Sequence, residues 1–110
     1  MNGNGDKAGW VALHRRLQDN PLWKERRVFS KAEAWLDLIM EARHETTPAE
    51  VMIGTHLITC GRGQCIKSLE TWANRWRWSK TKVHRVLNLF QRLKMIRLES
   101  VTKTTRITIC

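Results

Sequence analysis

The sequence of 110 residues contains no tyrosine. Tyrosine-dependent rolling-circle initiators, relaxases and recombinases form a covalent intermediate through that side chain, so these classes of DNA enzyme are excluded. Carboxylates are scarce in the second half, where residues 61 to 110 contain only Glu70 and Glu99, and these are too few for a two-metal nuclease site there. The sequence also lacks the HExxH, Walker, GxSxG and dinucleotide-binding motifs. We therefore expect a protein that is not an enzyme.

Long apolar runs are missing as well. No stretch approaches the ~20 apolar residues that cross a bilayer, and the opening MNGNGDK has no apolar signal region. We therefore expect an intracellular protein with no membrane partner. Length and composition predict a flexible N-terminal lead over residues 1 to 8, followed by a single domain over residues 9 to 110.

Cysteines are few and odd in number: Cys60, Cys65 and Cys110. This is typical of a reducing compartment. His56, Cys60 and Cys65 are spaced H-x3-C-x4-C, with Cys110 available as a fourth ligand, so a metal site is one interpretation. The spacing lacks the C-x2-C pairs of structural zinc sites, and cysteine is often a small buried hydrophobe. We therefore expect no metal and no other cofactor, with the metal site as the alternative. Cys65 and His56 could also form a nucleophilic pair, but the sequence has no motif that would orient them for catalysis.

Positive charge is abundant and unevenly placed. The chain has 20 Lys and Arg against 10 Asp and Glu, a net charge of +10. Residues 1 to 60 sum to zero, whereas residues 61 to 110 carry twelve basic and two acidic side chains. Residues 71 to 98 contain eight basic side chains and no carboxylate. A local excess of this kind indicates a polyanionic partner such as nucleic acid.

Apolar spacing predicts two helices in the first half. Trp10, Leu13 and Leu17 indicate a short helix that Asn20-Pro21 ends. A second helix follows the N-cap Ser30, and its apolar stripe consists of Trp35, Leu38, Ile39 and Ala42. The opposite face of that helix carries Glu33, Asp37 and Glu41. We interpret this acidic stripe as a solvated surface, with contact to a partner as the alternative.

Two stretches predict β-structure. Residues 51 to 53 and 56 to 60 are short β-prone runs broken at Gly54. Gly61-Arg62-Gly63 separates the second run from residues 64 to 67. We interpret these three residues as a hairpin turn rather than a phosphate loop. Near the C-terminus, residues 96 to 101 and 105 to 109 flank a hairpin tip at residues 102 to 104.

Two further helices lie between these stretches. Ser68 caps a helix with the stripe Leu69, Trp72, Ala73 and Trp76, and Ser79 caps a helix over residues 80 to 93. Trp78 lies in the short link between these two helices, and we expect it to pack between them and fix their angle. The alternative is that Trp78 stacks on an unpaired base. The side chains off the apolar stripe of the second of these helices are Lys80, Thr81, Lys82, His84, Arg85, Asn88, Gln91 and Arg92. They are donors suited to phosphates and base edges in the DNA major groove, and a merely solvated helix face is the alternative.

Two segments of the sequence resemble known families of DNA-binding proteins. Residues 73 to 83, ANRWRWSKTKV, with Leu87, Phe90 and Met95-Ile96, are similar to the winged-helix pattern of many bacterial DNA-binding proteins. Residues 9 to 38 are similar to the N-terminal domains of phage replication and DnaD-like replisome-organiser proteins. The resemblance implies an α+β class that is mainly helical: a winged helix-turn-helix with a three-helix core, an extra N-terminal helix, a short β-hairpin and a C-terminal β-wing.

The resemblance also implies the DNA-binding residues. The recognition residues that it implies are Ser79, Lys80, Thr81, Lys82, His84 and Arg85, and the wing contacts are Lys103 and Arg106. Beside these, we expect Ser68, Arg77 and Asn88 to contact DNA. The sequence departs from the family pattern at Arg77 and Lys94, where glycine is common. If these positions require a positive φ, each substitution costs about 1 kcal/mol.

These observations lead to one functional expectation and one alternative. We expect a non-catalytic module that binds double-stranded DNA and belongs to a phage or mobile-element replication or transcription-regulatory protein. We expect it in the cytoplasm of a bacterial or phage-infected cell, associated with the nucleoid. One such module buries only about 600 to 1,000 Å² on DNA, so we expect a homodimer formed through the neutral first half or a place in a larger protein. The alternative is a protein-interaction adaptor that docks on a host replication or defence complex through the acidic stripe and exposed tryptophans.

Overall fold

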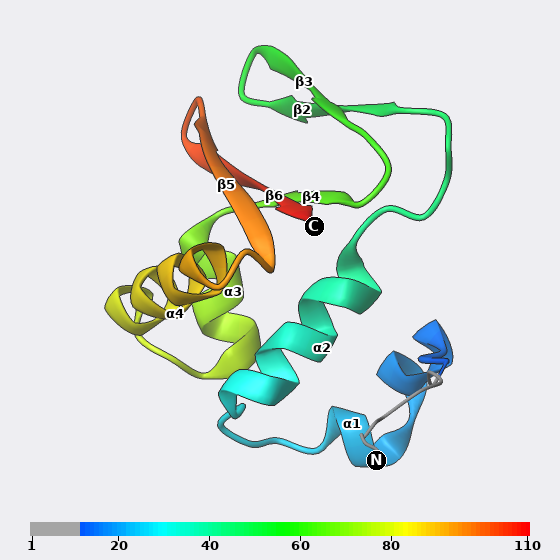
Figure 1. The fold of residues 1–110 in the computed structure, drawn as a ribbon, viewed down its shortest axis with the longest axis vertical. Coiled ribbons are helices and arrows are strands. Elements are labelled where there is room, and N and C mark those ends of the chain that lie inside the picture. Colours follow the sequence, from blue (N-terminus) through cyan, green and yellow to red (C-terminus); the bar gives the residue numbers. More distant parts are fainter. Residues whose placement is uncertain (1–11) are drawn as a thin grey trace.

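The computed structural model describes residues 12 to 110 of the chain (Figure 1). The predicted lead and Trp10 lie outside the described residues. The elements in chain order are η1 (Arg15–Asp19), α1 (Pro21–Lys24), α2 (Lys31–Glu41), β2 (Ala49–Ile53), β3 (His56–Cys60), β4 (Gln64–Lys67), α3 (Leu69–Trp76), α4 (Lys80–Arg92), β5 (Ile96–Val101) and β6 (Thr104–Ile109). Within the described part, no helix combines the length and apolar character needed to cross a bilayer.

The strand pairing corrects the predicted fold. The described chain is α+β with four α-helices and two antiparallel sheets, about 41% helical and 26% strand, so the mainly helical winged helix-turn-helix with one C-terminal wing is wrong. The reason is that β4 pairs with β6 and makes a three-stranded sheet in the order β4-β6-β5, in which Cys65 lies opposite Ile107 and both are buried. The β2–β3 hairpin is a separate two-stranded sheet.

The glycine-rich segment between β3 and β4 is not a hairpin turn, because these two strands do not pair. Gly63 donates its N–H to the carbonyl of Arg43 at 2.7 Å and accepts from the N–H of Ile109 at 2.8 Å. The hairpin turn lies earlier, at Gly54-Thr55, where Gly54 has a φ of 62° that glycine adopts without strain.

The N-terminal segment also differs from the prediction. A 3-10 helix, η1, ends before Asn20, and Pro21 then begins α1. The side chain of Asn20 accepts the N–H of Leu22 at 2.8 Å and caps the new helix. Proline has no N–H to satisfy at a first helical position, so Asn20-Pro21 starts a helix as well as ending one.

Helix α2 begins as predicted. Ser30 and Glu33 form a capping box, in which each side chain accepts the backbone N–H of the other. The interpretation of the opposite face is wrong at Asp37, which is fully buried. Its carboxylate receives hydrogen bonds from Arg75 on α3 and from the indole of Trp76 at 2.8 Å.

The α3–α4 pair confirms the predicted caps and junction. The hydroxyls of Ser68 and Ser79 accept N–H groups in the first turns of α3 and α4, each at 3.1 Å. Arg77 and Lys94 have φ values of 58° and 61°, so both departures from glycine fall on left-handed positions. Trp78 is buried and donates its indole N–H to the carbonyl of Phe29 at 2.8 Å.

The core is aromatic and joins the three longer helices to the sheet. Trp72 stacks on Trp76 with ring centroids 4.9 Å apart, and Trp76 meets Trp78 edge-on at 5.0 Å. Trp35 of α2 meets Phe90 of α4 at 5.8 Å. Figure 1 shows α3 and α4 on one side of α2, below the strands β5 and β6. This packing fixes which side of α4 faces the solvent.

Candidate nucleic-acid interface

Helix α4 has one apolar side and one polar side. Val83, Val86, Leu87 and Phe90 are buried in the core. The exposed residues Lys80, Thr81, His84, Arg85 and Arg92 therefore face outward, with Asn88 partly covered beside them. No segment of residues 12 to 110 covers this side.

A groove of about 530 Å³ runs along the outward side of α4. We call it the basic groove. It is lined by Lys31, Thr81, His84, Arg85, Val86, Asn88, Leu89 and Arg92. The lining contains three cations, neutral hydrogen-bonding groups and no carboxylate. Four of the predicted DNA-binding residues thus share one surface.

The basic groove also contains residues that the set of predicted contacts omitted. Lys31 is the first residue of α2 and lies far from α4 in the sequence. Packing of Trp35 on Phe90 brings the start of α2 to α4, and no local pattern reveals this. Arg92 lies two turns beyond Arg85 on α4, and its basic character off the apolar stripe is the signal that identifies it.

The cations of α4 are unpaired within residues 12 to 110, unlike many others. Arg27, Arg43, Lys67, Arg75 and Arg106 each lie within 3.7 Å of a carboxylate oxygen. None of the ion pairs found among the described residues involves α4. No carboxylate of residues 12 to 110 therefore pairs with the positive charge of this helix.

Two contacts order side chains on α4. The amide of Asn88 donates to the carbonyl of His84 at 2.9 Å and lies 3.1 Å from its ring Nε2. The ammonium group of Lys82 lies 4.5 Å from the ring centroid of Trp78, a cation–π contact that holds it near the start of the helix. These side chains are therefore partly held in place by contacts within the protein.

The predicted wing contacts lie in a different setting. Lys103 shares a cleft with Lys80, but Glu70 also lines it. The Arg106 guanidinium donates to both carboxylate oxygens of Glu99 and to the carbonyl of Thr59. The hydrogen bonds from Arg106 lower the pKa of Glu99 below its ordinary value. Arg106 is thus already engaged, and the acid-free surface lies toward Lys31 rather than toward the hairpin.

The remaining predicted contacts are separated from the basic groove. The hydroxyls of Ser68 and Ser79 serve as helix caps. Arg77 is exposed and lines another pocket, beside the N-terminal segment. The structure therefore brings Thr81, His84, Arg85 and Asn88 together in the basic groove. Lys80 and Lys82 lie on the same helix but do not line it, and neither do Ser68, Arg77, Ser79, Lys103 and Arg106.

The features on which two alternative interpretations depend are engaged within the described residues. The acidic stripe of α2 is internally paired: Asp37 with Arg75, Glu33 with Arg27 at 2.6 Å, and Glu41 with Lys67 at 3.4 Å. It does not offer free carboxylates to a partner. Trp78 is 7% exposed, which leaves no ring face for an unpaired base.

Cysteine and histidine do not assemble into a site in the described residues. No group of three His, Cys, Asp or Glu side chains there has the arrangement to hold a metal ion. Cys60 and Cys65 are buried, and burial raises the pKa of the Cys65 thiol to about 12. This is the setting of an unreactive packed thiol.

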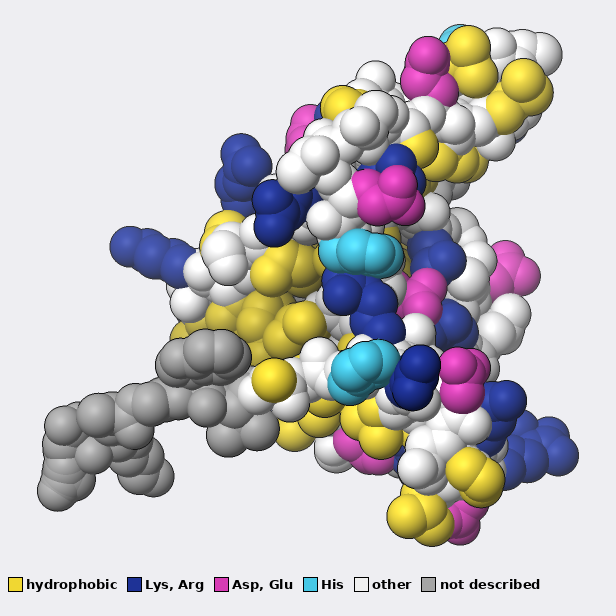
Figure 2. Space-filling view, turned by 90° about the vertical axis from the view of Figure 1, so that its right-hand side faces the viewer, with side chains coloured by type: hydrophobic (Ala, Val, Ile, Leu, Met, Phe, Trp, Pro, Cys, Tyr) yellow, Lys and Arg dark blue, Asp and Glu magenta, His cyan; other side chains and the backbone are white. Residues whose placement is uncertain are grey.

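The surface turned away from α4 has a different character. Figure 2 views the molecule from the right of Figure 1, whereas α4 lies at the left. Lys and Arg side chains there are interleaved with Asp and Glu. Mixed signs are usual on a solvated surface, so the acid-free groove is a local feature.

Comparison with known proteins gives no match: no protein-family model, no curated protein and no solved structure is similar to this chain. The winged-helix and replisome-organiser resemblance therefore rests on the sequence motifs alone.

Proposed function

We propose that this protein binds double-stranded DNA without catalysis, through the outward side of α4. The observation that carries the proposal is the basic groove, in which Lys31, Arg85 and Arg92 stand without a carboxylate. Cations brought together in this way repel one another, and a phosphate backbone relieves the repulsion as it releases its own counterions.

The chemistry of α4 suits the major groove, which is about 12 Å wide and admits an α-helix. Arg85 can donate two parallel hydrogen bonds to a guanine edge. Thr81 and Asn88 offer hydrogen-bonding groups to other base edges, and the partly exposed Leu89 offers an apolar contact to a thymine methyl group. Lys31 and Arg92 supply positive charge for phosphate contacts.

The size of the surface sets a further expectation. A single helix module buries about 600 to 1,000 Å² of protein surface on DNA, so we expect useful affinity to require a second copy or another domain. A role in phage or mobile-element replication or regulation follows from the sequence resemblance and is a part of the proposal that DNA binding alone does not test.

The experiment measures affinity for a duplex of random sequence as a function of salt. We expect a log–log slope steeper than about −3, since several phosphates are contacted. The variant Lys80→Glu/Arg85→Glu reverses two exposed charges on α4 and is expected to lose retention on DNA with an unchanged thermal midpoint.

A matched control separates the surface from net charge. Arg16→Glu/Arg62→Glu changes the net charge by the same amount at two exposed positions that line none of the clefts beside α4. We expect it to retain most of the affinity. Equal losses in both double variants, or no binding at low salt, would contradict the proposal.

A further inference from the structure

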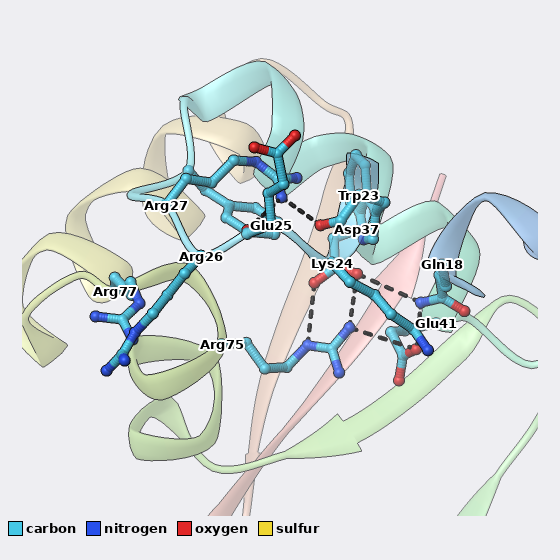
Figure 3. Close-up of a pocket in the computed structure, with 11 residues that line it drawn as sticks. Gln18, Trp23, Lys24, Glu25, Arg26, Arg27, Asp37, Glu41, Arg75 and Arg77 are labelled. Atoms are coloured by element: carbon cyan, nitrogen blue, oxygen red, sulfur yellow. Dashed lines mark hydrogen bonds and ion pairs between the residues drawn. The ribbon is translucent and has the colours of Figure 1, made fainter. Parts of the chain in front are cut away.

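A second pocket lies between the N-terminal segment and the α3–α4 turn (Figure 3). Its volume is about 430 Å³, and it shares no lining residue with the basic groove. The lining contains five cations, Lys24, Arg26, Arg27, Arg75 and Arg77, and three carboxylates, Glu25, Asp37 and Glu41. The question is which of these charges remain free.

The inner charges are satisfied within the protein. Arg75 donates to both oxygens of the buried Asp37, at 3.0 and 2.6 Å, and lies 3.5 Å from Glu41. Arg27 pairs with Glu33 at 2.6 Å, donates to the carbonyl of Trp23 and lies over its ring. These residues form the floor and wall of the pocket, and their charges are used.

The outer arginines are not satisfied in this way. Neither Arg26 nor Arg77 takes part in an ion pair or a side-chain hydrogen bond with any residue from 12 to 110, and both are exposed. Figure 3 shows their guanidinium groups at the same end of the pocket, one from the α1–α2 loop and the other from the α3–α4 turn. Two free guanidinium groups at one end raise the local positive potential.

The backbone of Arg77 has an unusual conformation. Its φ of 58° and ψ of 43° lie in the left-handed region, which disfavours side chains with a Cβ. Glycine relieves this strain, and the chain nevertheless carries a long charged side chain there that contacts no described partner. The same left-handed φ occurs at Lys94 and Thr102, so the case for Arg77 rests on its place beside Arg26 in the pocket.

We propose that Arg26 and Arg77 form an anion site that binds a phosphate group. Guanidinium forks match the oxygens of phosphate with two parallel hydrogen bonds, and two such forks supply two positive charges for a dianion. Figure 3 shows Glu25 extending away from this end and Lys24 reaching toward Gln18 and Glu41 at the other. The opposing carboxylates therefore do not fill the site.

The phosphate can come from two sources, a free phosphorylated molecule or the backbone of DNA. The first arm of the test therefore uses inorganic pyrophosphate at constant ionic strength and follows the thermal midpoint. A ligand that binds only the folded state raises the midpoint as its concentration increases. We expect this rise in the wild type, its loss in Arg26→Gln/Arg77→Gln, and its retention in the control Arg16→Gln/Arg62→Gln.

The second arm measures duplex affinity for the same variants. If the DNA backbone is the source, Arg26→Gln/Arg77→Gln weakens duplex binding about tenfold or more relative to the control, and the salt slope becomes shallower by about 2. Either response supports the site and identifies its ligand. Equal behaviour of the two double variants in both arms would overturn it.

A third variant keeps this result separate from the proposed function. Lys80→Glu/Arg85→Glu leaves the pocket lining intact, so its response to pyrophosphate is expected to equal that of the wild type. The α4 proposal and the phosphate site can therefore fail independently.

Discussion

The carboxylate of Asp37 lies 2.6 Å from Nη2 of Arg75 and 3.0 Å from its Nε, which makes a two-point ion pair between α2 and α3. Asp37 is fully buried, whereas Arg75 keeps 34% of its side chain exposed. The same carboxylate accepts the indole N–H of Trp76. Two helices and the aromatic core thus depend on one acidic side chain.

Replacing Asp37 with asparagine is expected to destabilise the fold. Removing one partner of a fully buried pair costs about 3 to 5 kcal/mol, and the partial exposure of Arg75 reduces this to about 2 to 3 kcal/mol. Urea denaturation measures the change. The control Glu41→Gln removes a more exposed carboxylate and is expected to cost less than about 1 kcal/mol; equal losses would show that burial of Asp37 is not decisive.

Glu33 gives a pH dependence of known sign. The Ser30 N–H and the Arg27 guanidinium donate to its carboxylate and lower its pKa below the ordinary value of 4.5. The unfolded state therefore binds this proton more readily, so the stabilisation is fully present above about pH 4.5 and is lost as the pH falls through the lower folded pKa. We expect Glu33→Gln to flatten the acid limb of a stability–pH curve; an unchanged limb would contradict this.

Arg77→Gly and Lys94→Gly test the left-handed positions. Each substitution removes a Cβ at a φ near 60° and is expected to raise stability by up to about 1 kcal/mol. They differ in function, because only Arg77 lines the proposed phosphate site. Thermal denaturation with and without pyrophosphate distinguishes them: both variants gain stability, and only Arg77→Gly loses the ligand response.

Lys31 tests the tertiary origin of the basic groove. Lys31→Gln is expected to weaken duplex binding uniformly across sequences and to make the salt slope shallower by about 1, as for loss of one phosphate contact. Arg16→Gln, at an exposed position outside the groove, is the control. If the salt slope of Lys31→Gln equals that of the wild type, Lys31 does not contact DNA and the interface is limited to α4.

Thiol reactivity tests the buried cysteines. Cys110 is exposed, whereas Cys65 is buried with a pKa of about 12. At about pH 8, iodoacetamide is expected to label Cys110 rapidly and Cys65 only after denaturation, because the thiolate is the reactive form. Mass spectrometry locates the labels. Rapid labelling of native Cys65 would show that its strand opens readily.

The features that sequence predicted well are local ones. Ser30, Ser68 and Ser79 cap their helices because the serine and its bonded N–H lie within three residues. The positive φ at Arg77 and Lys94 matches the positions where the family pattern has glycine. The outward set on α4 follows from helical periodicity, which fixes the buried stripe and hence the exposed one.

The features that it missed depend on distant partners. The sequence pattern places Asp37 on a solvated surface, because nothing near it in the sequence indicates Arg75, which lies 38 residues away. The pairing of β4 with β6 joins residues more than 35 positions apart, and the glycines after β3 suggested a local hairpin instead. Lys31 reached the basic groove only through helix packing.

The place of β6 in its sheet has a consequence for the α4 surface. As the middle strand of the order β4-β6-β5, it is the hydrogen-bonded neighbour of one strand before α3 and of another after α4. A cut that removes Thr104–Ile109 leaves both of those strands without a neighbour. The stability of the α4 surface to C-terminal truncation therefore depends on β6, which does not line the basic groove. Proteolysis within β6 would free the strands on either side of the α3–α4 pair.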